Sequence, residues 1–295
     1  MTVGVALRLL SVMVLWASCF PLITIGLDRA PHLAFAAMRA ALAGLCLVAF
    51  GAVFNRPMPR GARSWALVAL VGLGATSLGF LGMFHAAEFV SPGLATVIAN
   101  TQPLLAAILA HVFLQERLTV LGKTGLMAGF AGIGAIAWPG LADGDIQGYT
   151  LGIVYVVLAA TGVSIGNIAI KRLTGQVDAV MAMGLQLLIG AAPLALLSML
   201  TEDVSSLTWS ADFALVLVVL AVFGSSLAFW LWFAALEQVD LNRANSFTFL
   251  VPIFALAIGA ALFEERLAWI QVAGVVLVLA GIVLVQRDAP ERTRR

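Results

Sequence analysis

Long apolar runs separated by short polar stretches recur along the whole chain. A helix that crosses the hydrocarbon core of a bilayer, about 30 Å thick, needs about 20 mostly apolar residues. Ten segments satisfy this requirement, with ends defined to roughly four residues. They span about 5–26, 33–54, 64–86, 92–113, 120–138, 148–170, 179–200, 210–235, 242–263 and 268–286. The pattern therefore predicts an all-α integral membrane protein with ten transmembrane helices.

The first apolar run could instead be a signal peptide. It is longer than the apolar region of such a peptide, and the dipeptide Asp28-Arg29 makes a poor cleavage site. We therefore interpret this run as the first transmembrane helix.

Composition supports a membrane protein. Hydrophobic residues make up 62% of the chain, charged residues 11%, and the mean hydropathy is +1.06. A soluble domain carries about 25% charged residues, so there is too little polar surface here for a water-soluble body. The net charge of +1 does not favour nucleic-acid binding. Cys19 and Cys46 lie in apolar runs and are interpreted as small core residues, and without a Cys/His cluster we expect no metal or cofactor.

The basic residues predict which way the chain faces. Ten spans place both termini on one side, and 13 of the 16 Lys and Arg residues fall on that side. Lys and Arg next to spans stay in the cytoplasm. We therefore expect both termini in the cytoplasm.

The second half of the chain repeats part of the first half. A shift of 149 residues aligns 77–133 with 226–282, and 17 of the 57 aligned positions are identical. Both copies contain the sequence ERL, at 116–118 and 265–267, and Pro103 aligns with Pro252. The chain is thus predicted to consist of two repeats, 1–141 and 142–295.

Each repeat holds five predicted spans, and an odd number of spans makes the second repeat enter the membrane from the opposite face. Inverted repeats are typical of secondary transporters, which hold substrate near the midplane between the halves. The architecture favours alternating access over a passive, channel-like pore, which stays open as the rival function.

Several segments carry a family resemblance. They are the ten-span layout, WASCFPLITIGL in the first span, Arg39 in the second, the run around Pro103 and the two ERL sequences. Together they resemble the drug/metabolite transporter superfamily, EamA type. The resemblance implies export of small organic solutes, often amino acids, across a bacterial inner membrane. Other metabolites or drugs stay open as substrates. It also implies a cavity lined by the first four helices of each half.

Arg39 is the only basic residue predicted well inside a span. A charge at the bilayer centre costs about 2.5–3.5 kcal/mol on insertion scales. Two interpretations stay open: the side chain extends outward toward Asp28, or it faces the cavity and pairs with a substrate carboxylate.

Two prolines, Pro103 and Pro252, fall within spans at equivalent positions and are predicted to kink their helices. The kinks either expose backbone to a ligand or serve only packing.

Amide side chains near these prolines need partners outside their own helix, whereas serines can bond to their own helix. His85 either couples protons or lies at the interface. Aromatic rings either wall the cavity or face lipid; a cavity walled by rings favours aromatic or hydrophobic amino acids. The candidate substrate contacts are Trp16, Ser18, Arg39, Phe80, His85, Asn100, Gln102, Asn167, Gln186, Trp230, Asn245 and Phe249.

Two further patterns carry less weight. Residues 162–166 read GVSIG, which matches the G-x-S-x-G sequence of serine hydrolases, but the required strand-to-helix turn is not predicted, so we expect no enzyme. Glycines in the fifth and tenth spans, such as Gly125 and Gly274, fit close helix packing, either within the chain or in a homodimer. The expected partners are a small-molecule substrate and the lipid bilayer.

Overall fold

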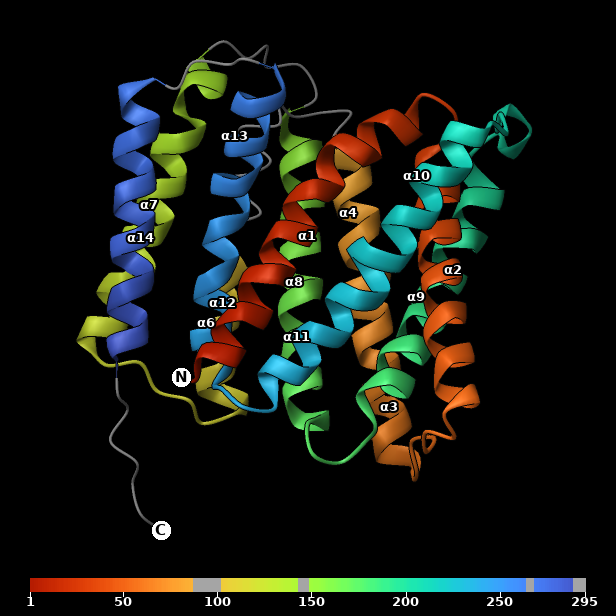
Figure 1. Cartoon of the computed structure of the whole chain (residues 1–295), viewed down its shortest axis with the longest axis horizontal. Helices are drawn as coiled ribbons and strands as arrows, with labels where there is room; N and C mark the ends of the chain where they lie inside the picture. The colour runs from red at the N-terminus through yellow and green to blue at the C-terminus, as the bar shows by residue number, and fades with distance from the viewer. Residues whose placement is uncertain (87–101, 143–148, 264–267, 289–295) are drawn as a thin grey trace.

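The computed structural model describes residues 1–86, 102–142, 149–263 and 268–288, and within these ranges all regular structure is helical (Figure 1). Seven helices are long and apolar enough to cross a membrane in the described part of the chain. They cover Val3–Leu27, His32–Val53, Ala62–His85, Leu151–Leu173, Ala179–Thr201, Ala211–Leu236 and Trp269–Arg287. The chain is a multi-pass membrane protein.

The long helices agree with seven of the predicted spans. They are α1 (Val3–Leu27), α2 (His32–Val53), α3–η1–α4 (Ala62–Val71, Gly72–Leu78 and Gly79–Ala86), α8 (Tyr149–Leu173), α9 (Ala179–Thr201), α10–η3–α11 (Ala211–Ala221, Val222–Leu227 and Ala228–Leu236) and α14 (Trp269–Arg287). A short 3₁₀ turn, η2 (Val204–Ser206), follows α9.

Of the other three predicted spans, one is described only in part, one forms a continuous helix and one is interrupted. The span at 92–113 is described only from Gln102, as α6 (Gln102–Phe113), and α7 (Val120–Ala142) follows it. The span at 242–263 consists of α12 (Leu241–Ser246), the 3₁₀ turn η4 (Phe247–Phe249) and α13 (Leu250–Phe263). Proline cannot donate to the carbonyl four residues earlier, which for Pro252 is Thr248 in η4, so the predicted interruption is where the 3₁₀ turn lies. Pro103 lies at the start of α6, and the residues whose backbone it would disturb are outside the described ranges.

Equivalent helices of the two repeats pack against each other in antiparallel pairs. Helix α2 contacts α9, and α7 contacts α14; the second pair lies side by side at one end of the molecule (Figure 1). On α7 and α14 the glycines allow this approach. A Cβ on Gly125 would lie 2.7 Å from the carbonyl of Gly281, and a Cβ on Gly132 would lie 2.7 Å from that of Gly274. The numbers rise along one helix as they fall along the other, so the two helices run in opposite directions.

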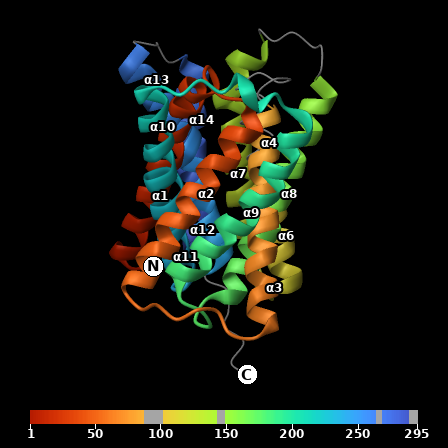
Figure 2. The ribbon, with the colours of Figure 1, turned by 90° about the vertical axis from the view of Figure 1, so that its right-hand side faces the viewer.

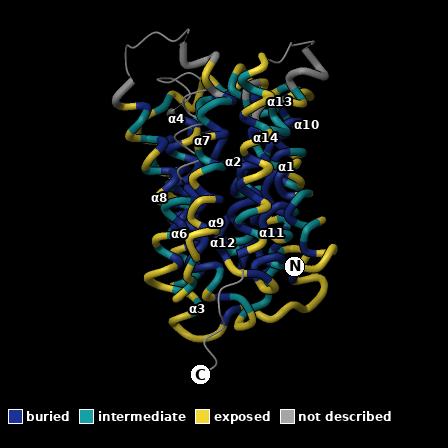
Figure 3. The backbone as a smooth tube through the Cα atoms, turned by 90° about the vertical axis from the view of Figure 1, so that its left-hand side faces the viewer, coloured by how far each residue is buried: buried dark blue, intermediate teal, exposed yellow. Residues whose placement is uncertain are grey.

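The remaining long helices pack across the two repeats in matched pairs, the third segment of each repeat against the first helix of the other. Segment α3–η1–α4 packs on α8, and α1 packs on α10, η3 and α11. Figure 2 shows α2, α9, α3 and α8 together on one side of the bundle. The buried residues line the interior between these helices, and exposed residues lie on the outside (Figure 3). The largest fully buried side chains include Trp232, Phe35, Phe213, Phe233 and Phe249.

Two π-helical turns interrupt the long helices at equivalent positions. Segment η1 covers Gly72–Leu78 and η3 covers Val222–Leu227, and the shift of 149 residues superimposes them. A π turn inserts one extra residue into a helix and frequently marks a functional site.

Candidate functional site

Arg39 lies on α2, about two turns or roughly 10 Å from the first residue of the helix at 1.5 Å per residue. Its side chain is turned into the bundle and is 5% exposed, so it does not extend outward toward Asp28. Its Nε donates to Ser225 Oγ at 2.9 Å, and its Nη2 donates to the Gly224 carbonyl at 3.2 Å. The extra residue of the η3 turn thus brings a hydroxyl and a carbonyl against the guanidinium.

Two further groups complete the surroundings of Arg39. Its Nη2 lies 3.5 Å from Cys19 Sγ on α1, and its Cζ lies 5.0 Å from the ring centroid of Phe80, a cation–π distance. Among the residues that the structure describes, no carboxylate pairs with this guanidinium. A buried charge without a counter-ion costs several kcal/mol, so the arrangement favours binding of an anion.

The other repeat contains an uncharged counterpart of this site. Thr76 of η1 donates through Oγ1 to Gln186 Oε1 of α9 at 2.8 Å. The shift of 149 residues pairs Thr76 with Ser225. Gln186 lies as far from the start of α9 as Arg39 lies from the start of α2. Gln186 is fully buried, and its Nε2 has no hydrogen-bond partner in the described part of the chain. The two repeats therefore place equivalent side chains in contact at this position, but only the contact made by Arg39 carries a charge.

The serines next in sequence reproduce the symmetry. Ser77 Oγ donates to the Gly190 carbonyl of α9 at 2.8 Å, and Ser226 Oγ donates to the Ala43 carbonyl of α2 at 2.9 Å. These bonds fix each π turn against the second helix of the opposite repeat.

A second polar cluster lies on α8, α11 and α12. Trp232 Nε1 donates to Asn167 Oδ1 at 3.0 Å, and Asn167 Nδ2 lies 3.4 Å from Asn245 Oδ1. Asn245 Nδ2 is buried without a partner among the described residues, and the same is true of Gln102 Nε2 on α6. Leaving a buried donor unpaired costs about 1–3 kcal/mol. Both donors are thus suited to an acceptor that a ligand supplies.

The aromatic candidates divide between the interior and the surface. Trp16 packs on Trp232 with ring centroids 5.5 Å apart and on Phe229 at 6.3 Å. Phe249 is fully buried, whereas Trp230 is 38% exposed on the outside of α11. Trp230, a candidate substrate contact, thus lies on the outer face, whereas Trp232, two residues later, is buried in the interior.

The remaining candidates lie away from these clusters or outside the described ranges. Ser18 donates to the Val14 carbonyl of its own helix at 2.8 Å. His85 packs on Tyr155 and His32, with ring centroids 5.1 and 6.1 Å away. Asn100 is outside the described residues. The serine of GVSIG, Ser164, donates within its own helix to Ala160 O at 2.7 Å and lies 3.2 Å from Gln102 O.

Sequence reasoning missed three contributors to the Arg39 site: Cys19, Gly224 and Ser225 were not among its predicted contacts. A usable signal lies one position before the aligned ranges, where the shift of 149 residues pairs Thr76 with Ser225. Cys19 carries no comparable signal, since a thiol within an apolar run is normally a core residue.

The chain matches one family profile and is similar to several known proteins. The sequence profile of the EamA-like transporter family matches residues 3–138 and again residues 150–287. The chain is 32% identical over 259 residues to the WAT1-related protein At3g02690 of Arabidopsis thaliana chloroplasts, covering 85% of this chain but only 61% of that protein. It is 27% identical over 280 residues to the uncharacterized transporter YvbV of Bacillus subtilis, covering 95% and 90% of the two chains. It is 30% identical over 289 residues to a probable amino-acid metabolite efflux pump of Salmonella typhimurium, covering 93% and 92%. One solved crystal structure matches with a TM-score of 0.83 at 20% identity, over 97% of this chain and 99% of the other, which shows the shared fold.

Proposed function

Because the chain belongs to the EamA-like transporter family, we propose that it is a secondary transporter that exports small organic metabolites by alternating access. In this proposal ten spans form two inverted halves, residues 1–141 and 142–295. Both termini lie in the cytoplasm, and the membrane is the inner membrane of a bacterium.

The antiparallel pairing of equivalent helices supports the inverted arrangement. Two halves with the same fold and opposite orientation can exchange conformations, which converts an inward-open state into an outward-open state. The bonds from Ser77 to Gly190 and from Ser226 to Ala43 are the same contact made once by each half. A passive pore has no need of such matched contacts.

The buried, unpaired charge of Arg39 is the observation that carries the substrate assignment. A guanidinium presents a planar fork of donors that fits a carboxylate bidentately. The unpaired amides of Gln102 and Asn245, together with Trp16 and Trp232, supply donors and apolar surface for the rest of a small metabolite. We propose amino acids as substrates, with preference for aromatic or hydrophobic ones. The name of the Salmonella relative, a probable amino-acid metabolite efflux pump, agrees with this class.

Counterflow in proteoliposomes tests the proposal. Vesicles preloaded with unlabelled phenylalanine or leucine should take up labelled amino acid faster than empty vesicles, and the rate should saturate. Arg39→Gln should raise the KM at least about tenfold, since a charge-assisted bidentate pair contributes more than 1.4 kcal/mol, a factor of ten. The control is Arg29→Gln, which removes an exposed charge from the loop between α1 and α2. Uptake without stimulation by preloaded solute would identify a passive pore.

A homodimer through α7 and α14 is a further part of the proposal. The glycine faces of these helices are buried against each other within the chain. A dimer would therefore use their outer faces, where Met127 is 58% and Val276 is 63% exposed.

A further inference from the structure

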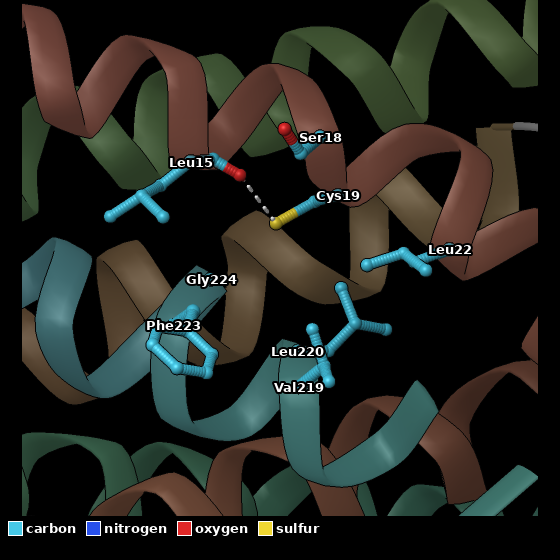
Figure 4. Close-up of a pocket in the computed structure, with 8 residues that line it drawn as sticks. All are labelled: Leu15, Ser18, Cys19, Leu22, Val219, Leu220, Phe223 and Gly224. Atoms are coloured by element: carbon cyan, nitrogen blue, oxygen red, sulfur yellow. Dashed lines mark hydrogen bonds between the residues drawn. The ribbon is translucent and has the colours of Figure 1, made fainter. Parts of the chain in front are cut away.

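A groove runs between α1 and the α10–η3 segment (Figure 4). Its volume is about 220 Å³. Its lining is apolar apart from one hydroxyl and one thiol, and consists of Leu15, Ser18, Cys19, Leu22, Val219, Leu220, Phe223 and Gly224. The hydroxyl of Ser18 is bonded to its own helix, so the groove presents mostly hydrocarbon to an occupant.

The groove opens on the side of the bundle that faces lipid. Ser18 lies on the outward stripe of α1 between Val14 and Ile25, which are 43% and 51% exposed. On the other wall Phe223 is 49% exposed. An occupant can therefore enter from the bilayer without crossing the helix bundle.

Cys19 and Gly224 line the groove and also contact the guanidinium of Arg39, and we call these two residues the floor of the groove. Cys19 Sγ and the Gly224 carbonyl lie within 3.5 Å of Arg39 Nη2. Gly224 keeps this floor thin, because a Cβ there would lie 2.5 Å from Cys19 Sγ and 3.3 Å from Arg39 Nη2. A thiol is a weak acceptor, so a carboxylate that displaces Cys19 would gain a stronger, charge-assisted bond.

The size of the groove indicates what it holds. An engineered apolar cavity of about 150 Å³ binds benzene, so this groove has room for a phenyl-sized or branched aliphatic group. A lipid tail would also fill apolar space, but it would leave the charge behind the floor unpaired. An amphipathic carboxylate would fill the apolar groove and would also pair with the charge of Arg39.

We propose that this groove is a membrane-facing binding site for small amphipathic carboxylates, with the apolar group between α1 and α10–η3 and the carboxylate on Arg39. The inference rests on the proposed function and adds a route: substrate reaches or leaves Arg39 through the lipid-facing side. It also narrows the substrate class to carboxylates with a compact apolar group.

Equilibrium binding of radiolabelled 3-phenylpropionate to the full chain in lipid nanodiscs tests the site. We expect saturable binding, and we expect acetate and 3-phenylpropionamide to compete at least about tenfold more weakly, because each lacks one half of the recognition and tenfold corresponds to 1.4 kcal/mol. Arg39→Gln and Leu22→Trp should each weaken binding by at least about tenfold, the first by removing the charge and the second by filling the groove. The matched control is Ile25→Trp, which adds the same ring to the outer face of α1 beyond the groove and should leave binding unchanged.

Three results would overturn the site. They are equal competition by acetate, unchanged binding in Leu22→Trp, and absence of saturable 3-phenylpropionate binding, which would mean that lipid occupies the groove. Counterflow of amino acids by the same preparation separates this failure from failure of the transporter proposal. If counterflow persists, the groove is wrong and the transporter stands; if counterflow is also absent, both fail.

Discussion

The carboxylate of Glu116 accepts a hydrogen bond of 2.8 Å from the backbone N–H of Leu241, which joins the loop after α6 to the first turn of α12. The same carboxylate accepts from the backbone N–H of Asn242 at 3.1 Å. Lys171 of α8 donates to the carbonyls of Leu236 and Val239 at 2.6 Å each. One acidic and one basic side chain thus hold the two ends of the turn between α11 and α12. The glutamate of the first ERL sequence serves as a helix cap for the other repeat.

The first prediction concerns the pH dependence of this contact. Burial raises the pKa of Glu116 above its usual value of 4.5, and the nearby Asp240 raises it further; the two backbone N–H groups and Lys171 lower it less than burial raises it. A raised pKa in the folded state means that the folded protein is favoured most below the ordinary pKa and loses stability as pH rises through the raised pKa, because the buried carboxylate becomes charged. Glu116→Gln keeps an acceptor oxygen and removes the titration. The thermal stability of the natural chain relative to this variant should therefore increase as pH falls from 7 toward about 4.5.

Hydrogen exchange at the amides of Leu241 and Asn242, compared between the two chains at each pH, locates the effect. Growing relative stability of the natural chain at higher pH would contradict the assigned sign.

The second prediction concerns the close approach of α7 and α14. Gly132→Val should destabilise the protein by about 1–3 kcal/mol, because the added carbons meet backbone of the opposite helix. The control is Gly134→Val on the same helix, where a Cβ would meet nothing within 4 Å. Thermal unfolding in detergent measures both. Equal losses in the two variants would mean that the close contact with α14 does not cause the effect.

The third prediction compares the two symmetric hydroxyls. Thr76→Val and Ser225→Ala each remove a buried hydrogen bond, and each should reduce stability by about 1–3 kcal/mol. Only Ser225→Ala should change the KM for substrate, because its hydroxyl orients Arg39 whereas Thr76 bonds the neutral Gln186. Counterflow kinetics and unfolding of the same preparations provide the two readouts. A KM that shifts equally in both variants would show that the two sites contribute alike.

The fourth prediction concerns Trp232. Trp232→Phe retains a ring but removes the bond to Asn167, so Asn167 Oδ1 loses its donor. We expect a loss of about 1–2 kcal/mol in stability and a weaker apparent affinity for substrate. Trp230→Phe is the control, since Trp230 lies on the exposed side of the same helix. A larger effect from Trp230 would reverse the assignment of inner and outer faces.

The sequence predicted where the helices begin and end better than it predicted the irregular turns within them. Span ends follow from the length of the apolar runs, so α1, α2 and α9 begin and end within a few residues of the predictions. The π turns η1 and η3 could not be predicted in this way. One extra residue scarcely alters an apolar pattern, and here polar and apolar residues do not alternate enough to show it.

The residues of the candidate site could also be predicted only in part. Arg39 stood out as a charge in an apolar run, but its partner Ser225 lies far away in sequence and is brought near only by packing of α2 on η3. In α11 every residue is apolar, so the pattern could not decide between Trp230 and Trp232 for the interior. Burial settles that choice in favour of Trp232.

The antiparallel match of the halves has a consequence for biogenesis. A bundle whose two halves make the same contacts in opposite directions packs nearly as well upside down as upright. Packing therefore gives the folding chain little information about which membrane face is which. In the proposed ten-span topology, that decision falls to the uneven distribution of arginine and lysine between the two faces, which acts while the chain is being inserted, before the helices meet.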